Sequence, residues 1–222
     1  MTEPKILKAS FNKNPFIGLY SRSSEKLTII PKNAPEKFAN EVETALKTET
    51  VRIFISQCAI TGILSALNSN GCVLPSFADE EEKRIIRKKG INVCTISEKY
   101  APGNNILVND YAALVNPSMD SKDRRKIGEC FNVEVFTHPI AGCRTVGAMN
   151  VVTNRGLLAY NEISQTEVKM LEKIFKVNGS IGTANMGSAA NALNLTANSN
   201  GAVIGELTSG FELQRIYEAL FG

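Results

Sequence analysis

A short polar turn recurs five times along the chain, and each copy lies between two apolar segments. The turns end at residues 26, 71, 112, 156 and 201, so successive copies are separated by 45, 41, 44 and 45 residues. Repeats of this length are typical of folds in which one supersecondary unit packs on copies of itself. The turns occupy residues 23–26, 68–71, 109–112, 153–156 and 198–201. We therefore expect five copies of one structural unit.

The composition of the turns predicts hairpin tips. Asn and Gly dominate them, and a tight hairpin needs positive φ, which Gly adopts freely and Asn tolerates. Eight or nine residues before four of the turns stands a further glycine, where a bend or a close backbone approach is expected. These positions are Gly18, Gly62, Gly103 and Gly147, and the fifth unit has Ala192 there.

A helix and a further strand follow each hairpin. Pairs of a capping residue and a glutamate three positions later predict four helix starts: Asn33 and Glu36, Asp79 and Glu82, Ser164 and Glu167, Ser209 and Glu212. The third unit, near Ser121, lacks such a pair. Strands are expected after the helices at 51–55, 93–96 and 133–136, with a weaker one at 179–182.

One unit alone cannot cover both its sheet face and its helix, so the units must pack on each other. Neither terminal unit has the polar character of a capping repeat, which favours a closed ring. The fifth helix has no strand after it, but residues 6–11 look like a strand with no helix before it. We predict a single α/β domain over residues 1–222: a closed five-part ring in which the N-terminal strand pairs with the C-terminal unit.

Composition excludes several classes of protein. The chain is 43% hydrophobic and 21% charged, with a net charge of +3, which is typical of a globular protein and too little for extensive phosphate neutralisation. No signal sequence and no apolar stretch of ~20 residues is found, so a cytoplasmic protein without a membrane segment is expected. The five cysteines form no C-x-x-C pair and are predicted to be buried thiols.

The sequence offers little catalytic chemistry. A single histidine, His138, excludes a multi-His metal site, and two glycine-rich segments, 142–147 and 182–187, lack the lysine of a phosphate-binding loop. We therefore expect no metal, no cofactor and no catalytic residue. The basic runs 83–89 and 122–126 form either solvated helix faces or a phosphate-binding surface.

Short polar residues at the expected rims of the ring are the best candidates for a surface that binds a macromolecule. They are Asn104, Asn105, Asn109, Asp110, Tyr111, Asn150, Asn154, Arg155, Asn185, Asn198 and Asn200.

Seven segments, in order, resemble the translation initiation factor 6 family of ribosome anti-association factors. They are 9–11 with 17–18, 68–71 with Pro75, 103–104 followed by 109–115, 140–147, 151–156, 182–185 and 197–203. The resemblance covers nearly the whole chain. It implies the pentein fold, a five-fold pseudosymmetric α/β propeller, which agrees with the ring inferred from the repeat.

The resemblance also implies a function without catalysis. A member of this family binds the joining face of the large ribosomal subunit, next to the sarcin–ricin loop of its rRNA and through ribosomal proteins there, and excludes the small subunit. Its release during subunit maturation is assisted by a GTPase and a maturation cofactor, and a monomer is expected. By its match to the family motif, Asn104 is the residue that the resemblance most directly implies as a contact with the subunit. The further contacts that we expect are Asn105, Asn109, Asp110 and Tyr111 in the same unit, and Asn154 and Arg155 in the next unit.

The chain also departs from the family. It stops at Gly222, without the long polar tail of eukaryotic members, which points to an archaeal-type protein. Ala192 replaces the glycine of the fifth unit, and Ile63 stands where some relatives have a basic residue.

Two alternatives remain open at this stage. Pentein folds also include amidine-modifying hydrolases with a Cys nucleophile and a His, for which only Cys143 and His138 come near each other in sequence. A free-standing rRNA-binding module would use the two basic helices and would bind with strong salt dependence.

Overall fold

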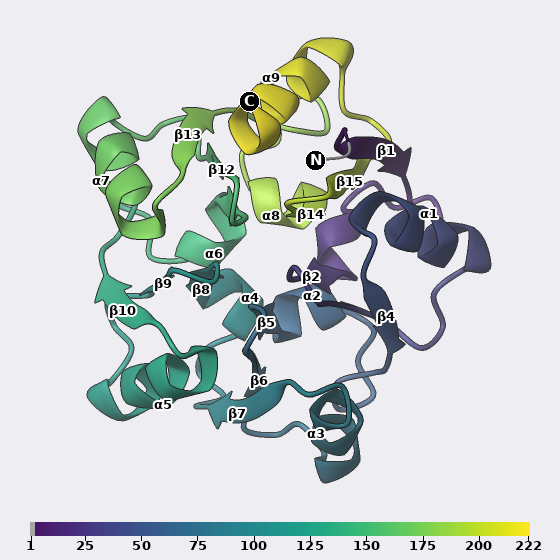
Figure 1. The fold of residues 1–222 in the computed structure, drawn as a ribbon, viewed down its shortest axis with the longest axis vertical. Helices are drawn as coiled ribbons and strands as arrows, with labels where there is room; N and C mark the ends of the chain where they lie inside the picture. Colours follow the sequence, from purple (N-terminus) through teal and green to yellow (C-terminus); the bar gives the residue numbers. More distant parts are fainter. Residues whose placement is uncertain (1–2) are drawn as a thin grey trace.

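The computed structural model describes residues 3–222, and this part of the chain forms five three-stranded sheets arranged around a common centre (Figure 1). In chain order their strands pair as β2-β3-β4, β5-β6-β7, β8-β9-β10, β11-β12-β13 and β14-β15-β1. The strands are β1 (Lys5–Ala9), β2 (Arg22–Ser23), β3 (Leu27–Ile30), β4 (Glu49–Arg52), β5 (Ala66–Leu67), β6 (Gly71–Pro75), β7 (Asn92–Ile96), β8 (Ile106–Val108), β9 (Ala112–Val115), β10 (Glu134–Thr137), β11 (Val151–Val152), β12 (Gly156–Ala159), β13 (Asn178–Ile181), β14 (Leu195–Asn198) and β15 (Gly201–Gly205).

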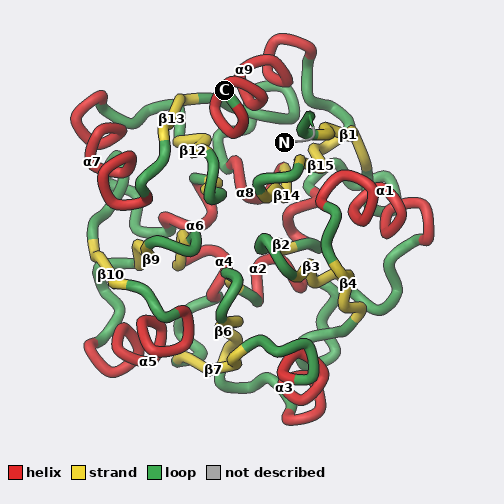
Figure 2. Tube along the Cα trace, in the orientation of Figure 1, coloured by secondary structure: helices red, strands yellow, loops and turns green. Residues whose placement is uncertain are grey.

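Each unit has the predicted order of hairpin, helix and strand. In the second unit β5 pairs antiparallel with β6, and β7 then returns parallel to β6, with Gly71 opposite Asn92. Long helices cover the outside of the ring and short helical turns line its inside (Figure 2). The outer helices are α1 (Glu36–Leu46), α3 (Glu80–Arg87), α5 (Ser121–Phe131), α7 (Gln165–Phe175) and α9 (Gly210–Phe221); the inner turns are η1 (Ile17–Leu19), α2 (Thr61–Leu64), α4 (Pro102–Asn105), α6 (Val146–Met149) and α8 (Asn191–Asn194).

The first described strand belongs to the last unit. β1 pairs in parallel with β15, from Lys5 opposite Gly201 to Ala9 opposite Gly205. This pairing covers the edge of β15 that would otherwise present unpaired backbone groups to solvent.

The inner elements touch each other all the way around the centre. The short helical turns contact in the order η1, α2, α4, α6, α8 and back to η1, and the inner strands do the same in the order β2, β5, β8, β11, β14 and back to β2. The five sheets nevertheless stay separate, because in residues 3–222 no strand pairing joins one sheet to the next. Packing rather than one continuous sheet therefore holds the units together.

In residues 3–222 the hydrophobic core consists of five clusters, and each takes side chains from two neighbouring units. Leu27 and Ile29 of the first unit pack with Leu74 and Ile86 of the second, for example. The other clusters join the remaining neighbours in the same way, including the fifth and first units through Val203. A unit alone would expose half of each interface, as the sequence predicts.

The prediction that Asn and Gly serve the five polar turns through positive φ is wrong. The positive-φ residues lie elsewhere, at helix ends and in the loops before the inner helical turns, such as Ser56 and Gln57. In the second turn the Asn68 Oδ1 atom instead accepts from the Gly71 amide at 2.9 Å. Gly71 is required by space, since a Cβ there would lie 2.3 Å from the carbonyl oxygen of Cys130.

Helix capping follows the sequence in three units. Reciprocal capping boxes are present at Asp79, Ser164 and Ser209, and in the third unit the Asp120 side chain accepts from the Asp123 amide without a reciprocal partner. The predicted cap at Asn33 is wrong. Pro35 occupies the cap position of α1, and no side chain caps that helix.

Burial of the cysteines differs from the prediction. Cys72 and Cys130 are buried, whereas Cys58, Cys94 and Cys143 are half-buried, and all five are free thiols. Within residues 3–222, no helix combines the length and the apolar character that crossing a bilayer requires.

Candidate functional site

The predicted partner-binding residues fall on two opposite faces of the ring. Asn104 and Asn105 belong to α4, whereas Asn109, Asp110 and Tyr111 form the turn at the other end of β8. We call the face with the inner helical turns the helix face and the face with the five polar turns the turn face. Strand β8 separates the two groups, and each of its three residues advances the chain by about 3.3 Å.

Hydrogen bonds between neighbouring turns organise the turn face. The Ser69 hydroxyl donates to Asp110 Oδ2 at 2.6 Å, and the Asn154 amide group donates to the same oxygen at 2.6 Å. Glu25 accepts from the backbone and hydroxyl of Ser199 in the fifth unit. Asp110 and Asn154 therefore hold adjacent turns in register while both remain half-buried.

Asn109 is a structural residue. It is 4% exposed, and its amide group donates to the carbonyl oxygens of Thr153 and Phe175 in the next unit, both at 3.0 Å. Its Oδ1 accepts from the amides of Tyr111 and Ala112. With all these bonds made inside the protein, Asn109 has no donor left for the partner contact that the sequence led us to expect.

Two predicted residues do reach solvent on the turn face. The Tyr111 side chain is 44% exposed, and the Lys176 ammonium lies 5.9 Å from the centroid of its ring. Arg155 donates from Nη2 to the carbonyl oxygen of Phe221 at 2.5 Å, and its guanidinium lies over the Phe221 ring. These contacts place both side chains at the junction of the third, fourth and fifth units.

On the helix face, Asn105 and Asn104 differ. Asn105 is 6% exposed, donates to the carbonyl of Ala101 and accepts from the Asn116 amide, so its role is to hold the α4 turn. Asn104 is half-buried, and its Oδ1 is buried without a hydrogen-bond partner among the described residues. Asn104 thus keeps hydrogen-bonding capacity that the protein itself does not use.

A charged residue that sequence analysis did not single out, Arg22, lies at the centre of the ring. Arg22 donates from Nε and Nη2 to the carbonyl oxygen of Gly62 and from Nη2 to that of Gly103. Burial lowers the pKa of Arg22 to about 10, so the guanidinium stays charged at neutral pH. Beside it lies a cavity of about 30 Å³, also lined by Asn150 and Thr196, which is the size of one or two water molecules.

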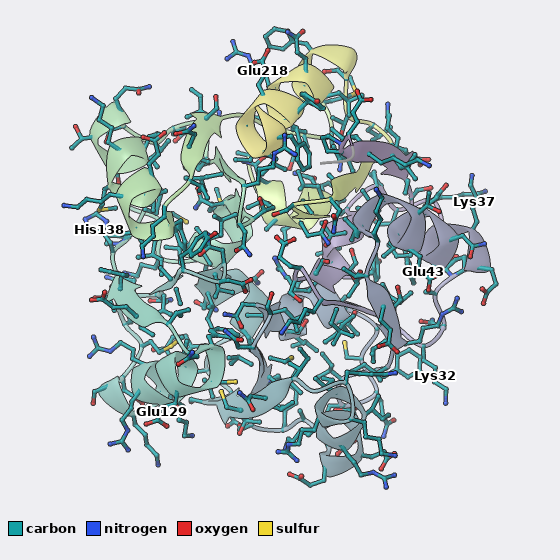
Figure 3. The ribbon with its side chains drawn as sticks, viewed as in Figure 1. Lys32, Lys37, Glu43, Glu129, His138 and Glu218 are labelled. Atoms are coloured by element: carbon teal, nitrogen blue, oxygen red, sulfur yellow. The ribbon has the colours of Figure 1, made fainter. Side chains whose placement is uncertain are left out.

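The geometry does not support Cys–His catalysis. His138 lies at the outer edge of the molecule (Figure 3), and its Nδ1 contacts the carbonyl oxygen of Pro139. The Cys143 sulfur lies 3.3 Å from Thr145 Oγ1. Neither residue lines the central cavity. Within residues 3–222, no group of three or more His, Cys, Asp or Glu side chains is arranged to hold a metal ion.

The basic side chains of α3, which carries the first basic run, are largely neutralised by acidic residues of the same helix. Lys83 pairs with Glu80 at 2.9 Å, Arg84 pairs with Glu81 at 2.6 Å, and Arg87 also pairs with Glu80 at 3.5 Å. On α5, Arg125 and Lys126 face Glu129 and Asp123 at 3.8 Å. Solvated helix faces explain these runs better than a phosphate-binding surface does.

Comparison with known proteins identifies the family. The family model described as the eIF-6 family matches residues 6–219. The chain belongs to the eIF-6 family. This confirms the resemblance seen in the sequence, and the five small sheets are consistent with the repeated fold of an eIF-6 family member.

Curated relatives match over nearly their full length. A protein of Picrophilus torridus is 38% identical over 97% of this chain and 99% of its own. Proteins of Pyrobaculum aerophilum and Pyrococcus horikoshii are each 36% identical, covering 92% and 97% of this chain and 93% and 98% of their own. All three are named translation initiation factor 6.

Proposed function

We propose that this protein binds the joining face of the large ribosomal subunit and sterically prevents premature association with the small subunit. The observation that carries the proposal is the eIF-6 family match over residues 6–219, together with relatives named translation initiation factor 6. Family membership supports a role in translation initiation. The anti-association mechanism, and a further role in large-subunit maturation, follow from the resemblance described above.

A steric block requires a rigid body, and the packing of the ring supplies one. Every hydrophobic cluster joins two units, and the inner helical turns contact each other around the whole centre. We propose that this arrangement is the closed propeller of the pentein fold, acting in the cytoplasm as a monomer without a cofactor. Release by a GTPase and a maturation cofactor is part of the same proposal.

Asn104 is the residue on the helix face that we propose contacts the subunit. Its side chain is half-buried and its Oδ1 has no partner among the described residues, so the Asn104 amide group is not committed to hydrogen bonds within the protein. On the turn face, Asp110, Tyr111, Asn154 and Arg155 remain as proposed contacts, with Asn109 supporting them from within. Asn105 supports Asn104 on the helix face by holding the α4 turn.

The proposal is tested by sedimentation of the purified protein with isolated large and small ribosomal subunits, followed by subunit joining at several magnesium concentrations. We expect stoichiometric migration with the large subunit alone and fewer joined ribosomes. Absence of binding, or equal binding to both subunits, would contradict the proposal.

A pair of variants tests the contact. Asn104→Ala is expected to weaken large-subunit binding about tenfold, because a hydrogen bond buried in the interface is lost. Asn161→Ala, an exposed asparagine in the loop before α7, is the matched control and should bind as the wild type does. Equal affinity of the two variants would remove Asn104 from the interface.

A further inference from the structure

We propose that a basic groove beside the turn face binds a single-stranded segment of RNA, with phosphates on Arg155, Lys173 and Lys176 and a base stacked on Tyr111. The inference deepens the proposed function, since a ribosomal subunit is largely RNA. It rests on different residues from Asn104 and is tested on free RNA, without ribosomes.

The groove lies between the turn that carries Arg155, the C-terminal end of α7 and the start of β13. The groove is open to solvent along its length, and its volume is about 480 Å³. The lining residues are Asn154, Arg155, Glu172, Lys173, Lys176, Val177 and Asn178.

The charge of the groove is positive. Lys173 and Lys176 are exposed, lie three residues apart at the end of α7, and form no ion pair within residues 3–222. The one carboxylate, Glu172, accepts a hydrogen bond from the Gly179 amide at 2.9 Å. Three cations thus face one carboxylate that is already bonded to the backbone, unlike the self-paired charges of α3.

Arg155 is positioned before any ligand arrives. Its Nη2 is bonded to the carbonyl oxygen of Phe221, and its guanidinium carbon lies 5.7 Å from the centroid of the Phe221 ring. The Nε and Nη1 groups retain donors that suit a phosphate. Because the side chain is already ordered, binding costs less conformational entropy than it would for a free arginine.

The aromatic component distinguishes RNA from other anions. Tyr111 is 44% exposed, and the Lys176 ammonium lies 5.9 Å from its ring centroid, so a stacking surface adjoins the cations. Exposed aromatic rings beside basic side chains are typical of single-strand binding. The amide of the exposed Asn178 adds groups that suit base edges or a ribose 2′-hydroxyl.

The test is fluorescence anisotropy with a labelled single-stranded RNA of about 12 nucleotides and mixed sequence. Three phosphate contacts predict a slope of about −2 for log affinity against log salt, which is roughly a twentyfold loss between 50 and 200 mM salt. Lys173→Ala with Lys176→Ala should weaken binding at least tenfold at 50 mM and reduce the slope by about 1.4. Tyr111→Ala should weaken binding about tenfold, whereas Tyr111→Phe should retain it.

The matched control removes two exposed lysines from the basic helices, in Lys88→Ala with Lys122→Ala, and should bind RNA as the wild type does. An equal loss in this control would assign RNA binding to the basic helices and overturn the groove. So would undetectable binding by the wild type at 50 mM salt, or equal binding of duplex RNA. Large-subunit sedimentation in parallel separates the two proposals. Subunit binding without RNA binding would contradict only the proposed RNA-binding groove. RNA binding without subunit binding would contradict only the proposed ribosomal function.

Discussion

A Cβ atom on Gly62 would lie 2.1 Å from the carbonyl oxygen of Gly18. The same relation links Gly103 to the Gly62 oxygen at 2.2 Å, Gly147 to the Gly103 oxygen at 2.6 Å, and Gly18 to the Ala192 oxygen at 2.0 Å. The inner helical turns thus meet backbone against backbone around the centre. At these four positions the sequence repeats glycine because a Cβ would meet the backbone of the neighbouring turn, whereas the fifth unit has Ala192 there.

Gly62→Ala should therefore lower the free energy of unfolding by about 3 kcal/mol, because the inner turns of two units must separate to admit a methyl group. Chemical denaturation measures the change. Gly210→Ala is the control, since a Cβ at that position meets nothing within 4 Å and alanine favours the helix that begins there. Equal stability of the two variants would show that the centre can relax.

Asn109→Ala should destabilise the protein by about 3 kcal/mol. The change leaves the buried carbonyl oxygens of Thr153 and Phe175 without the donor that joins the third and fourth units. Denaturation and large-subunit sedimentation are measured on the same sample, at a temperature where the variant is folded. Unchanged stability with lost subunit binding would make Asn109 a direct contact after all.

Removal of residues 1–9 should destabilise the fifth unit and promote self-association. β15 then loses its parallel partner, and its exposed edge becomes available to a second chain. Thermal denaturation and light scattering measure both effects. A synthetic peptide of residues 1–9 should restore the wild-type behaviour, and a scrambled peptide should not; a truncated chain as stable as the wild type would contradict the prediction.

Glu212 should make stability depend on acid pH. Burial opposes its ionisation, but hydrogen bonds from the Ser209 and Gly187 amides and from the Ser209 and Thr183 hydroxyls outweigh burial and lower its pKa below the usual 4.5. A native pKa below that of the unfolded chain gives stability that is present above about pH 4.5 and is lost as pH falls through the native value.

Denaturation of the wild type and of Glu212→Gln between pH 7 and about pH 3 checks this prediction. The stability difference between the two proteins should be largest at neutral pH and should shrink in acid. Glu206→Gln, an exposed glutamate in the loop before α9, is the control. A difference that stays constant with pH would exclude a role for Glu212 ionisation.

Local features of this protein were predictable wherever neighbours in sequence decide them. The repeat, the order of elements and the caps at Asp79, Ser164 and Ser209 all follow from nearby residues. The cap at Asn33 failed because Pro35 occupies the cap position. The prediction for Gly71 was wrong about the cause. Glycine is required there because a side chain would collide with the Cys130 carbonyl, and not because the backbone adopts positive φ.

The candidate site shows the same division. Sequence alone singled out Asn104, Tyr111 and Arg155, but it treated the polar rim as one surface. The tertiary structure separates Asn104 from Tyr111 by the length of β8. It also joins Arg155 to Lys173 and Lys176 in one groove.

By itself, the sequence determined the repeated unit, the family and the polar character of the turns, because spacing and turn chemistry are properties of adjacent residues. Only the tertiary structure decided that Asn109 is internal, that Arg22 occupies the centre, and that the charges of α3 neutralise each other. Those outcomes depend on atoms brought together from different units. Contacts across the ring leave no local pattern in the chain.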